Sequence, residues 1–439
     1  GSFVNIENSM SDSTPSGRTL DLVLAGLPKR RRAEKRFRFY GLASIVLGLF
    51  FLVVLFSSII SKGYSAFTYT HIALDINFDP AIINPDGKPA QEAIQSADYD
   101  PLWKASLTTL FPDVAERTRK KALNGLMSSS ASEKIQAALK AHPDWIGTTQ
   151  KLWLPANDTV DMLVKGHIDQ NPDEMSALLK DQIAWIDVLK SQERIHKEFN
   201  TVFLTRGDSR EPESAGIWGA VKGSGLTLLV TILLSLPIGV AAAVYLEEFA
   251  PRNRWTDLIE VNINNLAAVP SIVFGLLGLA VFINLFGIPR SSPLVGGLVL
   301  TLMTLPVIII AGRSALKSVP PSVREAALGV GASPMQMVID HVLPLAMPGM
   351  LTGAIIGLAR ALGESAPLLM IGMVAFIVDV PGSLTDPATV LPVQIYLWAD
   401  SPERAFIERT SAAILVLLAF LILMNGIAVY FRKRYERRW

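Results

Sequence analysis

Long apolar runs alternate with polar stretches along this chain, and most of them crowd into its second half. The hydrocarbon core of a membrane is about 30 Å thick, and a helix needs about 20 mostly apolar residues to cross it. Six runs approach that length: residues 39–60, about 226–246, 263–286, 294–310, 349–378 with polar interruptions, and 411–431. The pattern predicts a mostly α-helical, polytopic membrane protein with six transmembrane helices.

The polar stretch between the first two runs, residues 61–215, is long enough to be a domain. Alternation over 69–78 and 201–205 favours strands, and helical periodicity covers 102–110, 114–127, 132–139 and 175–199. We therefore expect an α+β domain inserted between helices 1 and 2. Its histidines lack metal-ligand spacing, so we expect no metal site. A structural or docking role and a ligand-binding role both remain open.

Basic residues concentrate before the first run and after the last. They are Lys29, Arg30, Arg31, Arg32, Lys35, Arg36 and Arg38 at one end, and Arg432, Lys433, Arg434, Arg437 and Arg438 at the other. Cytoplasmic flanks carry such an excess. We expect a cytoplasmic N-terminal segment (1–38), a cytoplasmic tail (432–439) and a periplasmic domain (61–215).

The first run, 39–60, is not followed by a small-residue cleavage site, which favours a retained span over a signal peptide. The chain opens on Gly1 and Ser2, which is not a natural start, and Met10 is a candidate initiator.

Composition supports the membrane class and excludes others. Half of the residues are hydrophobic and only 18% are charged, with a mean hydropathy of +0.37, unlike an ordinary cytosolic enzyme. The 40 Lys and Arg nearly balance the 39 Asp and Glu, which leaves no basic field for nucleic acid. The absence of cysteine excludes disulfides, thiolate metal sites and a cysteine nucleophile.

The stretch at about 313–345, between the fourth and fifth runs, carries two helix-start signals. Ser322 with Glu325, and Ser333 with Pro334 and Gln336, have the spacing of capping boxes. The glycines at 329 and 331 suit a left-handed turn between the two helices. The spacing thus predicts a short helix, a sharp turn and a second short helix on the cytoplasmic side.

A set of residues in this stretch resembles the EAA loop of permease subunits of bacterial ATP-binding-cassette (ABC) importers. The set is Glu325, Ala326, Ala327, Gly331, Leu343 and Pro344. The resemblance implies that the loop is the coupling segment that docks on a separate ATPase subunit. His341 departs from the family pattern, which usually has an aliphatic residue there, so the packing at that position is open.

Two further segments resemble the A-type permease family of the Pst high-affinity phosphate importer. They are residues 357–369, GLARALGESAPLL, and 265–275, NLAAVPSIVFG. The resemblance runs from about residue 223 to the end and implies a type I ABC importer permease fold over 216–431. It also implies inward transport of inorganic phosphate across the bacterial inner membrane. The large outside domain departs from the shorter members of the family.

The same resemblance implies the partners. They are a C-type phosphate permease subunit, a dimer of ATP-binding subunits that bind ATP and Mg²⁺, and a periplasmic phosphate-binding protein. No cofactor is expected in this chain. It also lacks a Gly-x-x-x-x-Gly-Lys-Ser/Thr phosphate loop, so we expect a non-catalytic transport subunit.

An arginine and a glutamate within an apolar run are costly in a bilayer and are candidates for function. With about 100° per helical residue, Arg360 and Glu364 fall on the same face as Gly349, Gly353 and Gly357. Glycines at four-residue spacing allow close helix packing, so that face is expected to point into the protein.

Two hypotheses remain for Arg360 and Glu364. Arg360 suits an oxyanion on the substrate pathway because its planar fork donates several hydrogen bonds. Alternatively, the two form a structural i, i+4 pair. Asn265 and Ser271 are weaker pathway candidates, since polar residues there also cap helices or bond between them.

The sequence leaves two alternatives to a phosphate permease. One is an ABC permease for another oxyanion or a phosphonate, which the loop fits equally well. The other is a membrane-anchored sensor with a periplasmic ligand-binding domain, for which an ATPase-docking loop has no use.

Overall fold

The computed structural model describes residues 17–168 and 176–435, and it divides after residue 59 into two compact units. The first unit consists of most of α1 (Gly17–Gly63), a continuous helix that contains the predicted first span. Residues 1–16 and 436–439 lie outside the described chain, with Gly1, Met10, Arg437 and Arg438. All other elements belong to the second unit.

Among the described residues, five helices are long and apolar enough to cross a membrane, and a sixth candidate is a bent pair. The five are Arg30–Phe67, Trp218–Phe249, Pro293–Ser318, Pro334–Gly363 and Ala405–Arg434. The bent pair is α11 (Arg254–Ala267) with α12 and η5, Ser271–Leu285, which meet at 105°. The mostly helical polytopic fold is confirmed, with six spans if the bent pair is one of them.

The third apolar run was expected to be one helix over 263–286, and this is wrong. α11 ends at Ala267, and α12 (Ser271–Leu277) starts after Pro270 in a new direction, continued by η5 (Gly278–Leu285). Proline disfavours helical backbone in the residue before it, and here the chain turns at that point.

The fifth run also differs from its expected bounds of 349–378. α16 spans Leu343–Gly363 and is preceded without a break by η6 (Met337–Val342). Glu364 is extended, with ψ of 127°, and the chain continues in the short pieces α17 (Ala366–Leu368) and η7 (Leu369–Met373). The span therefore begins earlier and ends earlier than the apolar run.

The helices within residues 218–435 pack closely around α13 (Pro293–Ser318) through small residues. On one side lies α10 (Trp218–Val244), and a Cβ on Gly297 would lie 2.4 Å from the Cβ of Val230. On the other side lies α16, where a Cβ on Gly353 would lie 2.1 Å from that of Ala311. α18 (Leu391–Ala399) and α19 (Ala405–Tyr435) complete this part of the chain.

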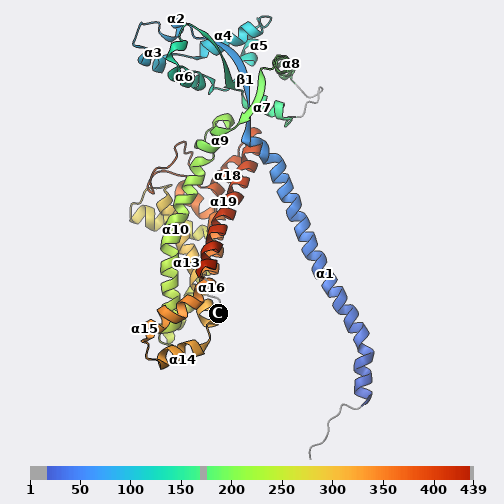
Figure 1. Cartoon of the computed structure of the whole chain (residues 1–439), viewed down its shortest axis with the longest axis vertical. Coiled ribbons are helices and arrows are strands. Elements are labelled where there is room, and N and C mark those ends of the chain that lie inside the picture. Colours follow the sequence, from blue (N-terminus) through green and yellow to red (C-terminus); the bar gives the residue numbers. More distant parts are fainter. Residues whose placement is uncertain (1–16, 169–175, 436–439) are drawn as a thin grey trace, which may run out of the picture. The chain divides into compact units, whose positions relative to one another are not determined.

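Residues 61–215, expected to be a separate domain, contain a three-stranded antiparallel sheet in the order β2-β1-β3. Its central strand, β1, is labelled in Figure 1. The strands are β1 (Thr68–Asn77), β2 (Thr149–Pro155) and β3 (Ile195–Phe199), and Ile72 pairs with both Leu154 and Ile195. Its α+β character is as expected. The apolar core joins β1 to the helices α4 (Asp100–Leu110) and α6 (Ala131–Ala141).

Further elements of the second unit are α2 (Pro80–Ile83), α3 (Ala90–Ser96), α4 (Asp100–Leu110), α5 (Arg117–Asn124), α6 (Ala131–Ala141), α7 (Asp158–Lys165), α8 (Ala177–Ser191) and α9 (Thr201–Thr205), with η1 (Tyr64–Phe67), η2 (Pro143–Trp145), η3 (Pro212–Ser214) and η4 (Tyr245–Phe249).

Two expectations in this domain are wrong. The helix over 175–199 ends at Ser191, because the chain turns through Glu193 at a φ of 54° and continues as β3; Met175 lies outside the described residues. The alternating segment 201–205 is the helix α9, not a strand. Asn200 starts it by accepting a hydrogen bond from the Phe203 backbone N–H.

A buried ionic network joins this domain to the first turns of α19. The Lys165 ammonium lies 2.6 Å from Asp161 Oδ2 and 2.9 Å from Glu408 Oε1, and all three side chains are at most 5% exposed. Asp161 also accepts a hydrogen bond from the Thr70 backbone. The adjacent Arg409 is fully buried, with its guanidinium over the rings of Tyr69 and Phe203.

Candidate functional site

The predicted coupling loop forms a short helix, a left-handed turn and a second helix. α14 (Pro321–Gly329) is followed by Gly331 at a φ of 93°, and α15 (Pro334–Gln336) leads into η6 and α16. At Ser333 the capping box is present, since its side chain accepts from the Gln336 N–H and Gln336 bonds back to the Ser333 N–H. Gly331 alone, not Gly329, has the left-handed backbone.

The first predicted capping box is wrong. α14 begins at Pro321 with Pro320 as its N-cap, so Ser322 lies inside the first turn. Proline at the first helical position presets the backbone, and this signal outweighs the serine one residue later. Glu325 is exposed on the helix.

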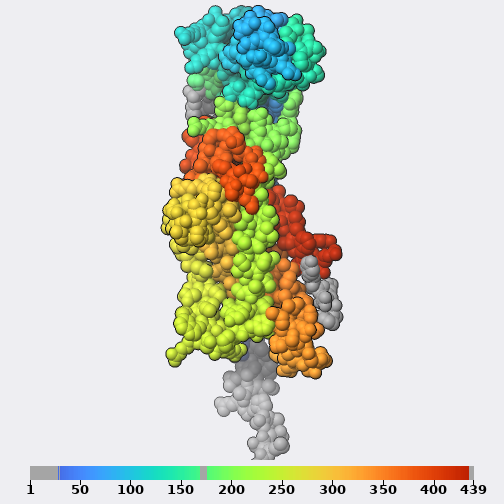
Figure 2. All heavy atoms as spheres, turned by 90° about the vertical axis from the view of Figure 1, so that its left-hand side faces the viewer, coloured from blue at the N-terminus to red at the C-terminus, as the bar shows by residue number. Residues whose placement is uncertain are grey.

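The loop, orange at the lower right of Figure 2, carries an apolar groove. The groove has a volume of about 680 Å³, and its lining includes Val323, Ala326, Ala327, Val330, His341 and Pro344. Val330 is 85% exposed, whereas Ala327 is buried in an apolar cluster with Ala243 and Leu316. Leu343 and Pro344 are half-buried and form the start of α16.

A two-pronged ion pair holds the loop against η4, the helical segment that follows α10. Arg324 donates through Nη2 to Glu248 Oε1 at 2.6 Å and through Nε to Glu248 Oε2 at 3.1 Å. The same guanidinium bonds the carbonyls of Leu316 and Val319 at the end of α13. The hydrogen bond to Glu248 raises the pKa of Arg324 above its ordinary value. The sequence prediction missed this partner, since 76 positions separate the two residues.

Arg360 and Glu364 lie together, as their spacing indicated, but not on one helix face. Arg360 Nε lies 3.6 Å from Glu364 Oε1, although Glu364 has left the helix as its C-cap. The Arg360 side chain is 52% exposed and that of Glu364 is 19% exposed. N–H groups of the Arg360 guanidinium are therefore available to a ligand on the exposed side of α16, which we call its open side.

The three glycines of α16 face α13 and not the open side. Added Cβ atoms on Gly349 and Gly353 would lie 2.8 and 2.1 Å from the Cβ atoms of Ala315 and Ala311, and one on Gly357 would lie 3.0 Å from Thr304. The expectation that Arg360 shares their inward face is thus wrong, because the arginine is exposed while the glycines pack.

Asn265 and Ser271 lie on either side of the break between α11 and α12. Asn265 is exposed near the end of α11, and Ser271 is the first residue of α12. Among residues 17–168 and 176–435, neither side chain bonds to Arg360. These two candidates and the Arg360 pair are therefore not brought into direct contact.

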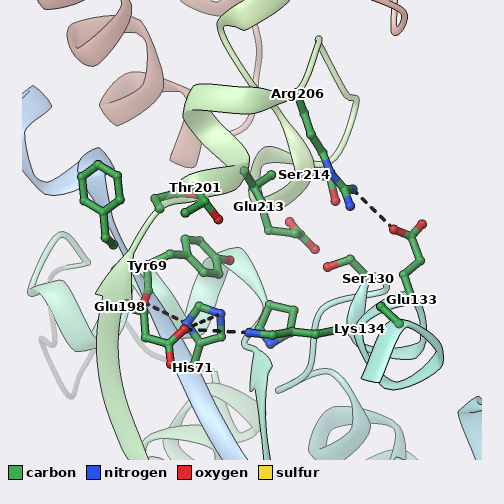
Figure 3. A pocket seen from close by; sticks show the side chains of 15 residues that line it. Tyr69, His71, Ser130, Glu133, Lys134, Glu198, Thr201, Arg206, Glu213 and Ser214 are labelled. Carbon is green, nitrogen blue, oxygen red and sulfur yellow. Dashed lines mark hydrogen bonds and ion pairs between the residues drawn. The ribbon is translucent and has the colours of Figure 1, made fainter. Parts of the chain in front are cut away.

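The segment 61–215 contains a polar cavity of about 230 Å³ that sequence reasoning did not identify (Figure 3). The side chains of Tyr69, His71, Ser130, Lys134 and Glu213 surround it. His71 and Lys134 lie 3.7 and 3.8 Å from Glu198. Within the described residues no group of His, Cys, Asp or Glu could hold a metal ion.

Glu213 is the most perturbed carboxyl group of this cavity. It accepts a hydrogen bond from Ser128, and it precedes α10 closely in the chain. Burial raises its pKa to about 7, with smaller contributions from Asp158 and Glu211. Burial also lowers the pKa of His71.

Because the pKa of Glu213 is raised, the free energy of unfolding of the protein depends on pH. A carboxyl whose pKa is raised on folding stabilises the fold fully below about pH 4.5, and this contribution is lost as the pH rises through 7. The loss is on the order of 3 kcal/mol by pH 8. We expect Glu213→Gln to unfold at a higher temperature than the wild type at pH 8. The measurement is thermal unfolding at pH 5 and pH 8.

The control for this prediction is Glu92→Gln, which removes an exposed carboxyl of α3. It is expected to leave the pH dependence unchanged. An equal pH dependence in Glu213→Gln and the wild type would show that Glu213 does not titrate in this range.

Two family descriptions match the chain. Residues 25–174 match a domain of unknown function, DUF3333. Residues 235–437 match the family described as "binding-protein-dependent transport system inner membrane component".

Several known proteins are similar. A probable ABC transporter permease protein, YqgI, of Bacillus subtilis is 38% identical over 38% of this chain and 56% of its own length. The phosphate transport system permease protein PstA 1 of Mycobacterium tuberculosis is 32% identical over 53% of this chain and 76% of its own length. The solved inward-facing MetNI methionine ABC transporter is 23% identical over 50% of this chain and 98% of its own, with a TM-score of 0.41.

Proposed function

The chain belongs to the PstA family of phosphate transport system permeases, and from that premise we propose that it is the membrane subunit that passes inorganic phosphate into the cytoplasm. The observation that carries the proposal is the coupling loop. Its apolar groove and the 85% exposed Val330 form a surface for a partner protein, and Arg324 ties that surface to α10 and α13. A force applied at the loop thus reaches the permease helices.

The proposed complex assigns ATP hydrolysis, phosphate delivery and phosphate passage to different subunits. An ATPase dimer docks on the loop, where Glu325 and Ala326 are exposed, and binds the ATP and Mg²⁺. A C-type permease subunit covers the open side of α16, and a periplasmic binding protein delivers phosphate. This chain itself has no catalytic step in the proposal.

Arg360 is the proposed phosphate contact. A half-exposed arginine in a membrane span needs water, a partner subunit or a ligand around it. Glu364 leaves part of the guanidinium uncompensated at 3.6 Å, so an oxyanion can take the remaining N–H groups and leave again. Asn265 and Ser271 stay weaker candidates for the same pathway.

Uptake tests the proposal directly. Vesicles containing the reconstituted complex should accumulate labelled phosphate when ATP is supplied, and excess sulfate or phosphonate should leave the rate unchanged. Competition by either anion would favour the alternative of a different oxyanion substrate. Purification without an ATPase subunit and without uptake would favour the sensor.

The proposed topology predicts how single cysteines label, because the natural chain has none. Ser129 is exposed in the outer domain and Ser322 in the coupling loop. Ser129→Cys should react with an impermeant thiol reagent from outside, and Ser322→Cys only after the membrane is opened. Reaction of Ser322→Cys in intact, outer-permeabilised cells would contradict the cytoplasmic loop.

Gly331→Val should weaken coupling of ATP hydrolysis to transport while insertion stays normal. A β-branched residue at a φ of 93° costs on the order of 1–3 kcal/mol, enough to displace α14. The measurements are phosphate-stimulated ATPase activity and uptake. Gly329→Val is the matched control, since that glycine has no atom within 4 Å of an added Cβ and no left-handed backbone. Equal uptake by both variants would show that the turn does not matter.

A further inference from the structure

A second cavity, which we call the Lys62 pocket, lies where the outer domain meets the membrane helices. Three distant segments line it: the end of α1 with Lys62, the residue after the α7 cap with His167, and the start of α19 with Arg404. Its volume is about 280 Å³. Gly166, at a φ of 77°, ends α7 and turns the chain so that His167 follows at the exposed surface.

The charge in this pocket is not balanced. Among the described residues, no carboxylate pairs with Lys62, His167 or Arg404, and all three are exposed. Lys62 and Arg404 face a single acidic lining residue, Glu408. Its carboxylate is bound at 2.9 Å by Lys165, which also pairs with Asp161 at 2.6 Å. The neighbouring Glu403 lines a different cavity. The Lys62 pocket therefore offers a lysine, an arginine and an imidazole to a ligand that is negatively charged.

The position of the pocket indicates what that ligand is. Lys62 stands two positions after the apolar run at 39–60, and Arg404 precedes the membrane helix α19. Ile407, which also lines the pocket, is 59% exposed on the first turn of α19. Cations beside an exposed apolar side chain at a span end match the headgroup region of a bilayer. The positive end of the α19 dipole adds to the attraction for an anion.

We propose that the Lys62 pocket binds a phosphate group. This is either the headgroup phosphate of a phospholipid in the outer leaflet of the inner membrane or a free phosphate ion. Arg404 supplies a fork of N–H donors and Lys62 a second charge. The site is separate from Arg360 and does not depend on which anion the permease transports. A bound headgroup there would fasten the end of α1 to α7 and α19 at the membrane surface.

The test has two arms on the full chain purified in detergent. In the first, native mass spectrometry measures phospholipid retained through delipidation. In the second, calorimetry at pH 7 follows inorganic phosphate added to lipid-depleted protein. In the double variant Lys62→Gln with Arg404→Gln, either the amount of retained phospholipid or the affinity for inorganic phosphate should fall about tenfold, depending on which of the two is the ligand. The matched control is Lys140→Gln with Arg117→Gln, which removes two exposed cations elsewhere in the outer domain.

The outcomes separate the two sources of phosphate. Loss of retained phospholipid in the pocket variant, but not in the control, supports a lipid headgroup. Loss of phosphate binding in the second arm supports a free ion. If both arms give equal results for the pocket variant and the control, the proposal is overturned. Should the double variant not fold, Lys62→Gln and Arg404→Gln are compared singly, since each side chain is exposed.

Discussion

Arg360→Gln is expected to reduce phosphate uptake by about ten- to a hundredfold while the complex still assembles. Glutamine keeps some hydrogen bonding but loses the charge and the fork of donors, and a charge-assisted hydrogen bond contributes about 1.5–3 kcal/mol. Because the Arg360 side chain is 52% exposed, its loss opens no packing defect. The measurements are complex yield and the initial rate of labelled uptake.

The double variant Arg360→Gln with Glu364→Gln separates the two hypotheses for this pair. If Arg360 contacts phosphate, the double variant assembles and still fails to transport. If the pair is structural, the single variant leaves Glu364 uncompensated and lowers yield, and the second change restores both yield and uptake. Full uptake by the double variant would remove Arg360 from the pathway.

Gly353→Leu is expected to prevent stable assembly of the permease helices. A Cβ there would lie 2.1 Å from Ala311 Cβ, and therefore α13 and α16 must separate to admit any side chain. Overpacking of this kind costs about 3 kcal/mol. Yield of folded protein and its thermal unfolding in detergent provide the measurement.

Gly426→Leu is the matched control for this variant. Gly426 also lies in a membrane helix, α19, but no atom lies within 4 Å of an added Cβ. Its yield is expected to stay near that of the natural chain. Equal yields for the two variants would contradict the close packing of α13 and α16.

The apolar runs predicted where the spans lie because hydrocarbon demands about 20 uncharged residues whatever the fold. They did not predict which prolines break a helix. Pro237 and Pro306 lie inside the long helices α10 and α13, whereas the chain turns at Pro270. Neighbouring helices decide whether the backbone groups freed by a proline find partners, and that packing is not local.

In the candidate site too, the sequence predicted the local features and not the contacts between distant segments. The turn at Gly331 and the cap at Ser333 are set by neighbours within four positions, so their spacing predicts them. Arg324 pairs with Glu248, which is 76 positions away, and the periodicity of the sequence does not indicate such a distant partner. The exposure of Arg360 was not predicted either. The helical projection located the inward face from the small residues alone, and it does not show which neighbouring helix packs against each face.

The ionic network at Lys165 bears on how the chain is made. Lys165 and Glu408 are 243 positions apart, so the segment that carries Lys165 leaves the ribosome long before Glu408 is synthesised. Until α19 is inserted, Lys165 lacks one of its carboxylates, and the rings of Tyr69 and Phe203 lack the covering Arg409. The final helix thus completes the domain as well as the bundle. A chain that lacks α19 therefore exposes a surface that the complete chain buries.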